Sequence, residues 1–297
     1  MNPRRLAGLF AVLLIVGAGC NRGGGTGTTQ ASPTAAPTFA AGSFMAELQQ
    51  RGEIKIGVKY DVPQFGFFDV TSNKAEGMDV DLGNIIADRL GVKATFSEAV
   101  STNRIPFLQN DTVDLIISTM TINEERKQQI AFSNVYYVAK QRLLVAKDST
   151  IKDVDDLDSQ KATVCSAEGS TSEKNIRIVA PNANVVLLKG YSDCFQQLQN
   201  KQQVQAVTTD DVILTSLLSK DPANFKLTGE AFTVEPYGMG IKKDRTDFVE
   251  FVNEVLTDVK EDGTWVKLYN KWVKPLTKED QEPPPDEVAA EAASPRP

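Results

Sequence analysis

Apolar and polar positions alternate along this chain with two different periods, one typical of strands and the other typical of helices. Glu53–Val58 alternates apolar and polar side chains as a strand does, and Val113–Ile117 is a short apolar run rich in β-branched residues, which favours a buried strand. Residues 76–91 instead carry apolar side chains at helical spacing and end at Gly91, a typical helix terminator. Because such strands and helices alternate between residues 43 and 275, the pattern predicts an α/β fold.

One apolar segment is too long for a single strand of a single sheet. Val135–Val145 has Lys140 and Gln141 in its middle, a pattern expected of a strand that crosses between two lobes. Residues 237–241 then return as a strand to the first lobe. We therefore expect two lobes with a ligand cleft between them: lobe one over residues 43–138, a hinge crossing at 139–142, lobe two over 143–233, and a return to lobe one over 234–277.

The two ends of the chain lack the pattern of a folded core. Arg4 and Arg5 precede an apolar stretch, residues 6–18, which has the length of an export signal and is too short to span a membrane. Residues 20–42 are rich in Gly, Thr, Ala and Pro, which predicts a disordered tether. Residues 278–297 are acidic and rich in proline, which predicts a disordered tail.

The small residues before Cys20 resemble a bacterial lipoprotein cleavage site. This resemblance implies a signal peptide over residues 1–19, lipidation of Cys20, and a protein anchored to the outer face of the cell membrane. Gly17 departs from the motif, which usually has leucine at that position, so an ordinary secretory signal with an incidental cysteine is the alternative.

Composition narrows the classes of function. The chain is 41% hydrophobic and 24% charged, as in soluble globular proteins. It contains no histidine, which excludes histidine triads and histidine metal sites. Its net charge of −7 makes nucleic acid an unsuitable partner. We expect a monomer that uses no cofactor and no metal.

The chain has three cysteines, and an exported protein with an odd number leaves one to be explained. If Cys20 is lipidated, Cys165 and Cys194 remain as a pair, which outside the cytoplasm favours a disulfide. Two separate buried thiols and a redox pair are the alternatives, although the spacing is not that of a C-x-x-C motif.

Residues 113–133 form the segment on which the functional prediction depends. The apolar strand ends in a hydroxyl-rich loop with Thr119 and Thr121, and Asn123 is a suitable N-cap for a short helix that carries Arg126. Open α/β folds bind ligands at such strand ends, where the planar fork of Arg126 could hold a carboxylate. The alternative is a surface turn in which Arg126 pairs with a neighbouring glutamate.

The motif T-x-T-x-x-x-E-R in this segment, followed by AFSxxYY, resembles the type II extracytoplasmic solute-binding proteins of family 3, which deliver polar amino acids to ABC importers. The segments G-x-D-V-D-L and D-G-T-W-x-x-L-Y-x-K-W resemble the same family. The resemblance implies the two-lobed type II periplasmic-binding-protein fold. It also implies that Thr121 and Arg126 bind the α-carboxylate of an amino acid, with Thr119 beside them.

The motif N-R-I-P-x-L-Q-x-x-x-V-D-L resembles the members of this family that bind acidic amino acids. In those proteins the residues that match Arg104 and Lys59 are basic, and the arginine reaches the side-chain carboxylate. The resemblance therefore implies glutamate, and possibly aspartate, as the ligand. The alternative for Arg104 is a pair with Glu98.

Two segments of lobe two complete the expected site. The resemblance implies that Gly169, Ser170 and Thr171, which open a helix, contact the ligand carboxylates, and that Asp210 accepts the α-ammonium. Plain helix capping is the alternative for the loop, and Asp211 is the better candidate for an N-cap at the second segment. We expect Asp79 and Asp81 to cap their own helix rather than touch the ligand.

Taken together, these patterns predict the substrate-binding lipoprotein of an ABC importer, similar to the actinobacterial glutamate-binding lipoproteins and not an enzyme. Its expected partners are a small amino acid, a membrane permease, and the membrane itself through Cys20. Two alternatives remain: a sensor of extracellular amino acids for a membrane kinase, and an exported enzyme on the same fold such as a cyclohexadienyl dehydratase.

Overall fold

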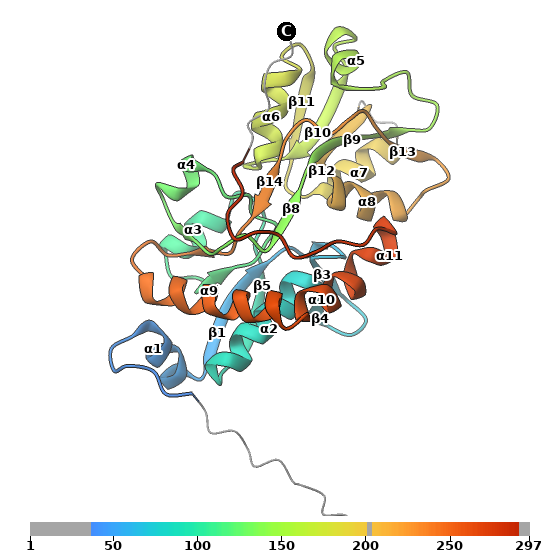
Figure 1. The fold of residues 1–297 in the computed structure, drawn as a ribbon. Coiled ribbons are helices and arrows are strands. Elements are labelled where there is room, and N and C mark those ends of the chain that lie inside the picture. The colour runs from blue at the N-terminus through green and yellow to red at the C-terminus, as the bar shows by residue number, and fades with distance from the viewer. Residues whose placement is uncertain (1–36, 201–203, 291–297) are drawn as a thin grey trace, which may run out of the picture. The chain divides into compact units, whose positions relative to one another are not determined.

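The computed structural model describes residues 37–200 and 204–290 (Figure 1). The predicted signal peptide, Cys20 and most of the predicted tether lie outside the described residues. Within the part of the chain that the structure describes, no helix is both long and apolar enough to cross a membrane.

The first lobe is built on a mixed sheet with strand order β5-β1-β6-β15-β7. Strands β5 and β6 run parallel to β1, while β15 is antiparallel to both β6 and β7. Helix α2 packs on β1 and β5 and contacts α9 and α10, so helices from the two ends of the fold cover one lobe. The elements are α1 (Phe44–Arg51), β1 (Glu53–Val58), α2 (Met78–Leu90), β5 (Lys93–Glu98), α3 (Arg104–Gln109), β6 (Leu115–Ile116), α4 (Glu124–Lys127), β7 (Ala131–Phe132), β15 (Gly240–Ile241), α9 (Thr246–Glu261), α10 (Thr264–Trp272) and α11 (Lys274–Thr277).

The second lobe has a sheet with strand order β11-β10-β12-β9-β13, in which β9 is antiparallel to both of its neighbours. Helix α6 packs on β10 and β12 with α5 beside it. Helix α7 also packs on β10 and β12, and its neighbour α8 packs on β12, β9 and β13. The elements are β9 (Gln141–Ala146), α5 (Val154–Ser159), β10 (Thr163–Ala167), α6 (Thr171–Val179), β11 (Asn184–Leu188), α7 (Tyr191–Gln199), β12 (Ala206–Asp210), α8 (Asp211–Ser219) and β13 (Phe225–Thr228).

Two short antiparallel strands, β8 (Tyr137–Ala139) and β14 (Glu235–Tyr237), cross between the sheets as a pair (Figure 1). The single long strand expected over Val135–Val145 is divided between β8 and β9, because Lys140 bonds to Asp211 instead of to a neighbouring strand. A small sheet of β2 (Asp61–Val62), β3 (Gly66–Asp69) and β4 (Lys74–Glu76) completes the fold.

A disulfide joins Cys165 on β10 to Cys194 on α7, with a Cα–Cα distance of 5.4 Å. The structure thus contains the pairing expected from the sequence, and the alternative of two separate thiols does not apply. Both cysteines are fully buried. The bond ties α7 to the sheet on which it packs.

Trp265 is also buried. Its indole N–H donates to the carbonyl of Tyr136 at 2.7 Å, just before β8. Helix α10 is therefore attached directly to one of the two crossing strands.

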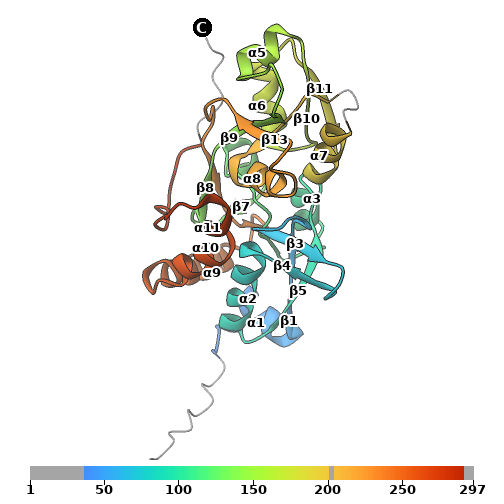
Figure 2. The ribbon, with the colours of Figure 1, turned by 90° about the vertical axis from the view of Figure 1, so that its right-hand side faces the viewer.

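The chain after α11 does not behave as the predicted disordered tail over residues 278–290. The Val135 N–H donates to the carbonyl of Asp286 at 2.8 Å, and Lys260 Nζ lies 2.7 Å from the Asp286 carboxylate. Pro284 is buried. Figures 1 and 2 show this dark red segment running from α11 past the crossing strands. Its acidic and proline-rich sequence lacks periodicity because the segment packs as an extended chain, which needs no periodic apolar face.

Removal of residues 279–297 is expected to destabilise the folded protein. The truncation loses the Val135–Asp286 backbone bond and the burial of Pro284, which together are worth about 1–2 kcal/mol. For a domain of this size that loss lowers the thermal midpoint by about 2–6 °C, measurable by circular dichroism. Removal of residues 291–297 alone is the control, and equal midpoints for both truncations would contradict the assigned contacts.

Candidate functional site

The loop after β6 is the starting point of the site. Thr119 has a φ of +43°, an unusual conformation for a residue with a side chain. Its N–H donates to Asp79 Oδ2 at 3.1 Å, and Asp79 Oδ1 accepts from the Tyr136 hydroxyl at 2.9 Å. Asp79 is fully buried, and this burial raises the pKa of its carboxyl to about 7. Asp79 therefore fixes the loop to the start of the hinge.

This role differs from the helix cap expected for Asp79 and Asp81. Gly77 is the N-cap of α2 and has a φ of 132°, and because glycine has no side chain, no side-chain hydrogen bond caps the helix. Asp81 accepts instead from Lys271 and from the indole of Trp272, each at 2.7 Å. The two acidic residues thus tie α2 to other parts of lobe one.

Arg126 is placed by the short helix α4. Asn123 is its N-cap, as predicted, and accepts the Arg126 N–H at 2.9 Å. The guanidinium is buried, and it donates to the Thr121 carbonyl at 2.7 Å and to the Gly169 carbonyl of lobe two at 3.4 Å. Burial lowers the pKa of Arg126. The surface turn considered from the sequence is wrong, because the nearby glutamates pair with Lys127 and Lys174.

Arg104 lies at the start of α3 and is buried as well. Its Nη1 donates to the carbonyls of Ser118 and Thr119 at 3.0 and 3.2 Å. Burial, together with the charge of Arg126, lowers the pKa of Arg104 to about 9. The alternative pair with Glu98 is absent, since Glu98 pairs with Lys189.

Lys59 follows β1 and is 1% exposed. Its Nζ donates to the Ser101 hydroxyl at 3.0 Å and lies 5.4 Å from the centre of the Tyr191 ring. Burial, together with the charge of Arg104, lowers the pKa of Lys59 to about 8. The amine therefore loses its proton more readily than an exposed lysine does.

Asp210 ends β12 and is buried. Its Oδ2 accepts a short hydrogen bond from the Tyr237 hydroxyl, whereas its buried Oδ1 has no hydrogen-bond partner among the described residues. Burial raises the pKa of this carboxyl, and the nearby charge of Glu235 adds to the effect. Asp211 is the residue that binds local backbone, accepting the N–H groups of Lys140 and Val212. An unpartnered buried acceptor of this kind suits a cationic ligand group.

The loop before α6 faces the same region from lobe two. Ser170 caps the helix by accepting the Glu173 N–H at 3.0 Å, so the capping alternative applies to its hydroxyl. Gly169 has a φ of +74°, and a side chain there would lie 3.0 Å from Thr102 of lobe one. Thr171 donates to Glu235 at 2.8 Å. The two lobes therefore approach each other closely here.

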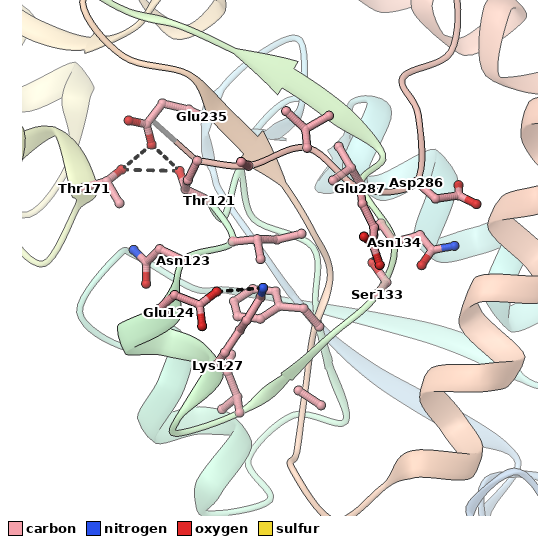
Figure 3. A pocket seen from close by; sticks show the side chains of 18 of the residues that line it. Thr121, Asn123, Glu124, Lys127, Ser133, Asn134, Thr171, Glu235, Asp286 and Glu287 are labelled. Carbon is pink, nitrogen blue, oxygen red and sulfur yellow. Dashed lines mark hydrogen bonds and ion pairs between the residues drawn. The ribbon is translucent and has the colours of Figure 1, made fainter. Parts of the chain in front are cut away.

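Glu235 and Asp61 were not singled out as contacts by the sequence analysis. Glu235, on β14, accepts from Thr121 and Thr171 (Figure 3). Asp61 accepts the N–H groups of Tyr191 and Ser192 at the start of α7, across the cleft from β2. No motif indicates either carboxylate, because each binds groups that are distant in sequence.

The structure brings most of the predicted site residues into one region between the lobes. Lys59, Arg104 and Asp210 are close enough to shift one another's pKa values, as are Arg104 and Arg126. A pocket of about 1000 Å³ is lined by Thr121, Thr171 and Glu235 (Figure 3), but Lys59, Arg104, Arg126 and Asp210 are not among its lining residues. Among the described residues, no group of three acidic or cysteine side chains could hold a metal ion.

Comparisons with known proteins show the family and the fold of the chain. The family model of bacterial extracellular solute-binding proteins, family 3, matches residues 54–275. The ABC transporter glutamine-binding protein GlnH of Bacillus subtilis (strain 168) is 39% identical over 272 residues, 91% of this chain and 95% of that protein. The glutamate-binding protein GluB of Corynebacterium glutamicum is 31% identical over 258 residues, 82% of this chain and 86% of that protein. The solved structure of an ancestral arginine-binding protein bound to glutamine is 38% identical with a TM-score of 0.70, covering 75% of this chain and 98% of that one.

Replacement of Asp79 by asparagine is expected to change how stability depends on pH. Because the folded pKa of about 7 lies above the usual value of 3.8, the folded state holds this proton more tightly. The wild type therefore loses stability as pH rises from about 4 to about 7, by at most about 1.4 kcal/mol per pH unit. Asp79→Asn lacks this loss, so wild type should lose stability relative to the variant across the window.

Urea denaturation at pH 5, 6, 7 and 8 measures this difference. Asp88→Asn, on the exposed face of the same helix, is the matched control and should keep the wild-type slope. Parallel stability curves for wild type and Asp79→Asn would show that Asp79 is not the titrating group.

Proposed function

This chain belongs to the bacterial extracellular solute-binding proteins of family 3, and from that premise we propose that it is the substrate-binding protein of an ABC importer for glutamine, with glutamate as the second candidate. The observation that carries the proposal is the pairing of two buried, opposite charges across the cleft. Arg126 extends from lobe one, and Asp210 of lobe two has a buried oxygen without a partner among the described residues.

An α-amino acid carries a carboxylate and an ammonium group on the same carbon atom. We assign its carboxylate to Arg126, whose planar fork suits bidentate binding, and its ammonium to Asp210 Oδ1. Thr121 already donates its hydroxyl to Glu235, so its main-chain N–H is the group we assign to the carboxylate, with Thr119 beside it. Gly169, Ser170 and Thr171 close the site from lobe two. The N–H groups of Gly169 and Ser170 donate to Glu173 and to the Ala167 carbonyl, so the N–H of Thr171 is the one we assign to the ligand carboxylate.

The side chain of the ligand extends toward Lys59 and Arg104 in this proposal. We place glutamine before glutamate because Arg104 already donates to two main-chain carbonyls. Its guanidinium therefore has acceptors without a second carboxylate from the ligand. The 39% identity to a glutamine-binding protein supports the same order. Glutamate is kept because Lys59 is buried with only a hydroxyl as its hydrogen-bond acceptor. The acidic ligand expected from the sequence thus becomes the second candidate.

Binding without chemistry is the activity we propose. An enzyme on this fold would need an acid poised at the cleft, but Asp61 accepts two main-chain N–H groups and Glu168 is exposed. A sensor for a membrane kinase would use the same ligand contacts. Delivery to a permease, lipidation of Cys20 and action as a monomer at the outer face of the cell membrane are parts of the same proposal.

Isothermal titration calorimetry tests the proposal directly. The protein is freed of ligand by unfolding and refolding with the disulfide intact, and then titrated with glutamine, glutamate, aspartate, asparagine and arginine. We expect tight binding of glutamine, and loss of all binding in Arg126→Ala because the α-carboxylate is common to every ligand. Retained micromolar affinity in that variant would remove Arg126 from the site, and no binding to wild type would refute the function.

The preference between glutamate and glutamine is expected to depend on the charge of Lys59. Because its pKa is about 8, the amine is protonated below that pH and becomes neutral above it. Only glutamate gains an ion pair with the charged form. The ratio of glutamate to glutamine affinity should therefore fall as pH rises from 7 to 9, by up to about tenfold per unit above pH 8.

The ratio is informative because both ligands carry an α-ammonium, so most of the effect of its titration cancels. The side-chain carboxylate of glutamate makes its ammonium slightly less acidic, which works against the expected fall in the ratio. Calorimetry at pH 6.5, 7.5, 8.25 and 9 provides the values. Lys59→Met should make the ratio independent of pH, and a constant ratio in wild type would exclude Lys59 from the side-chain site.

A further inference from the structure

Glu235 occupies an unusual place for a carboxylate. It lies on the crossing strand β14, opposite Ala139 of β8, and is 2% exposed. A buried carboxylate is costly unless several donors reach it. The positions of the groups that donate to Glu235 therefore indicate its role in the fold.

Both lobes supply donors to Glu235. From lobe one, the Thr121 hydroxyl donates to Oε2 at 2.7 Å. From lobe two, the Thr171 hydroxyl donates to the same oxygen at 2.8 Å, and Asn175 Nδ2 donates to Oε1 at 2.9 Å. Figure 3 shows the two threonines converging on one carboxylate from opposite sides.

This arrangement requires the two lobes to be close together. The Thr121 and Thr171 hydroxyl oxygens lie only 3.3 Å apart, although one follows β6 and the other begins α6. A rotation of the lobes about β8 and β14 separates the two hydroxyls, and one oxygen atom cannot then accept from both. The complete set of bonds therefore exists only when the cleft is closed.

We propose that Glu235 is a latch that holds the closed cleft by accepting hydrogen bonds from Thr121 and Thr171 at once. The inference rests on the proposed function, since a latch matters to a receptor that closes on its ligand. Glu235 is a positioning residue here, because it acts through the two threonines and not through the ligand.

The ligand site and the latch share Thr121. Arg126 donates to the Thr121 carbonyl at 2.7 Å while the hydroxyl of the same residue donates to Glu235. A carboxylate bound at Arg126 holds that guanidinium in place, and this fixes Thr121 in the position that Glu235 needs. Ligand binding and closure are thereby linked through one residue.

The kinetics of ligand binding test the latch. A contact that forms only on closure slows ligand release and leaves the association step unchanged. In Glu235→Gln the negative charge is lost, so we expect the dissociation rate constant to rise by about tenfold while the association rate constant stays within about twofold. Stopped-flow fluorescence with glutamine, using the tryptophans of the chain, measures both.

Thr171→Val supplies a second variant that keeps Glu235 and removes the donor from lobe two. It should raise the dissociation rate as Glu235→Gln does, and the double variant should show less than the product of the two effects, because both break the same bond. Glu124→Gln is the matched control: it removes one carboxylate from the same pocket, but within the described part of the chain Glu124 forms its ion pair with Lys127 of its own lobe.

The outcomes separate the latch from the proposed function. If wild type binds none of the five amino acids, the function fails and the latch fails with it. If wild type binds glutamine and both variants release it at the wild-type rate, the latch alone is wrong. Multiplicative effects in the double variant would also overturn it, since they would mean that Glu235 and Thr171 act separately.

Discussion

A guanidinium taken out of water must keep acceptors for its N–H groups, because an isolated buried charge is costly by several kcal/mol or more. Arg126 meets this requirement with a carbonyl from each lobe, Thr121 and Gly169. In this closed arrangement, one buried cation therefore donates to both halves of the molecule and connects the loop after β6 to the start of α6.

Main-chain carbonyls also serve Arg104, and they belong to the same loop. That loop includes Thr119 in a conformation that non-glycine residues avoid, and the buried Asp79 compensates by accepting its N–H. Asp79 in turn accepts from Tyr136, which adjoins the crossing strand β8. Buried hydrogen bonds thus connect Arg104 to the loop after β6 and that loop to the crossing strand β8. Because these bonds are shielded from water, we expect a substitution at one of these positions to affect the others.

Local patterns explain how much of this was predictable from the sequence. Strand and helix periodicity indicated the two-lobed α/β fold, and an N-cap at Asn123 indicated where Arg126 begins its helix. The cysteine pair followed from the number of cysteines and the expected compartment. Each of these signals lies within a short stretch or in the composition.

The features that escaped prediction depend on contacts between distant segments. Asp79 looked like a helix cap because it lies in the first turn of α2, but its partners are 40 and 57 positions away. Glu235 meets Thr121 at a separation of 114 residues. The chain after α11 looked disordered because composition reports the absence of a periodic face, whereas its order comes from a backbone bond to Val135.

The count of buried charges connects this geometry to the choice of ligand. Lys59, Arg104 and Arg126 can each carry a positive charge, and Asp210 and Glu235 a negative one. The positive groups thus exceed the negative groups by one charge. A zwitterionic amino acid adds one charge of each sign and leaves this excess unchanged, whereas the side-chain carboxylate of glutamate adds a negative charge that cancels the excess. With glutamine, the remaining positive charge is offset only in part by Asp79, whose pKa lies at about 7. Lys59, with its pKa at about 8, is the cation that loses its proton most readily. The excess positive charge can therefore be removed either by deprotonation of Lys59 or by the side-chain carboxylate of a bound glutamate.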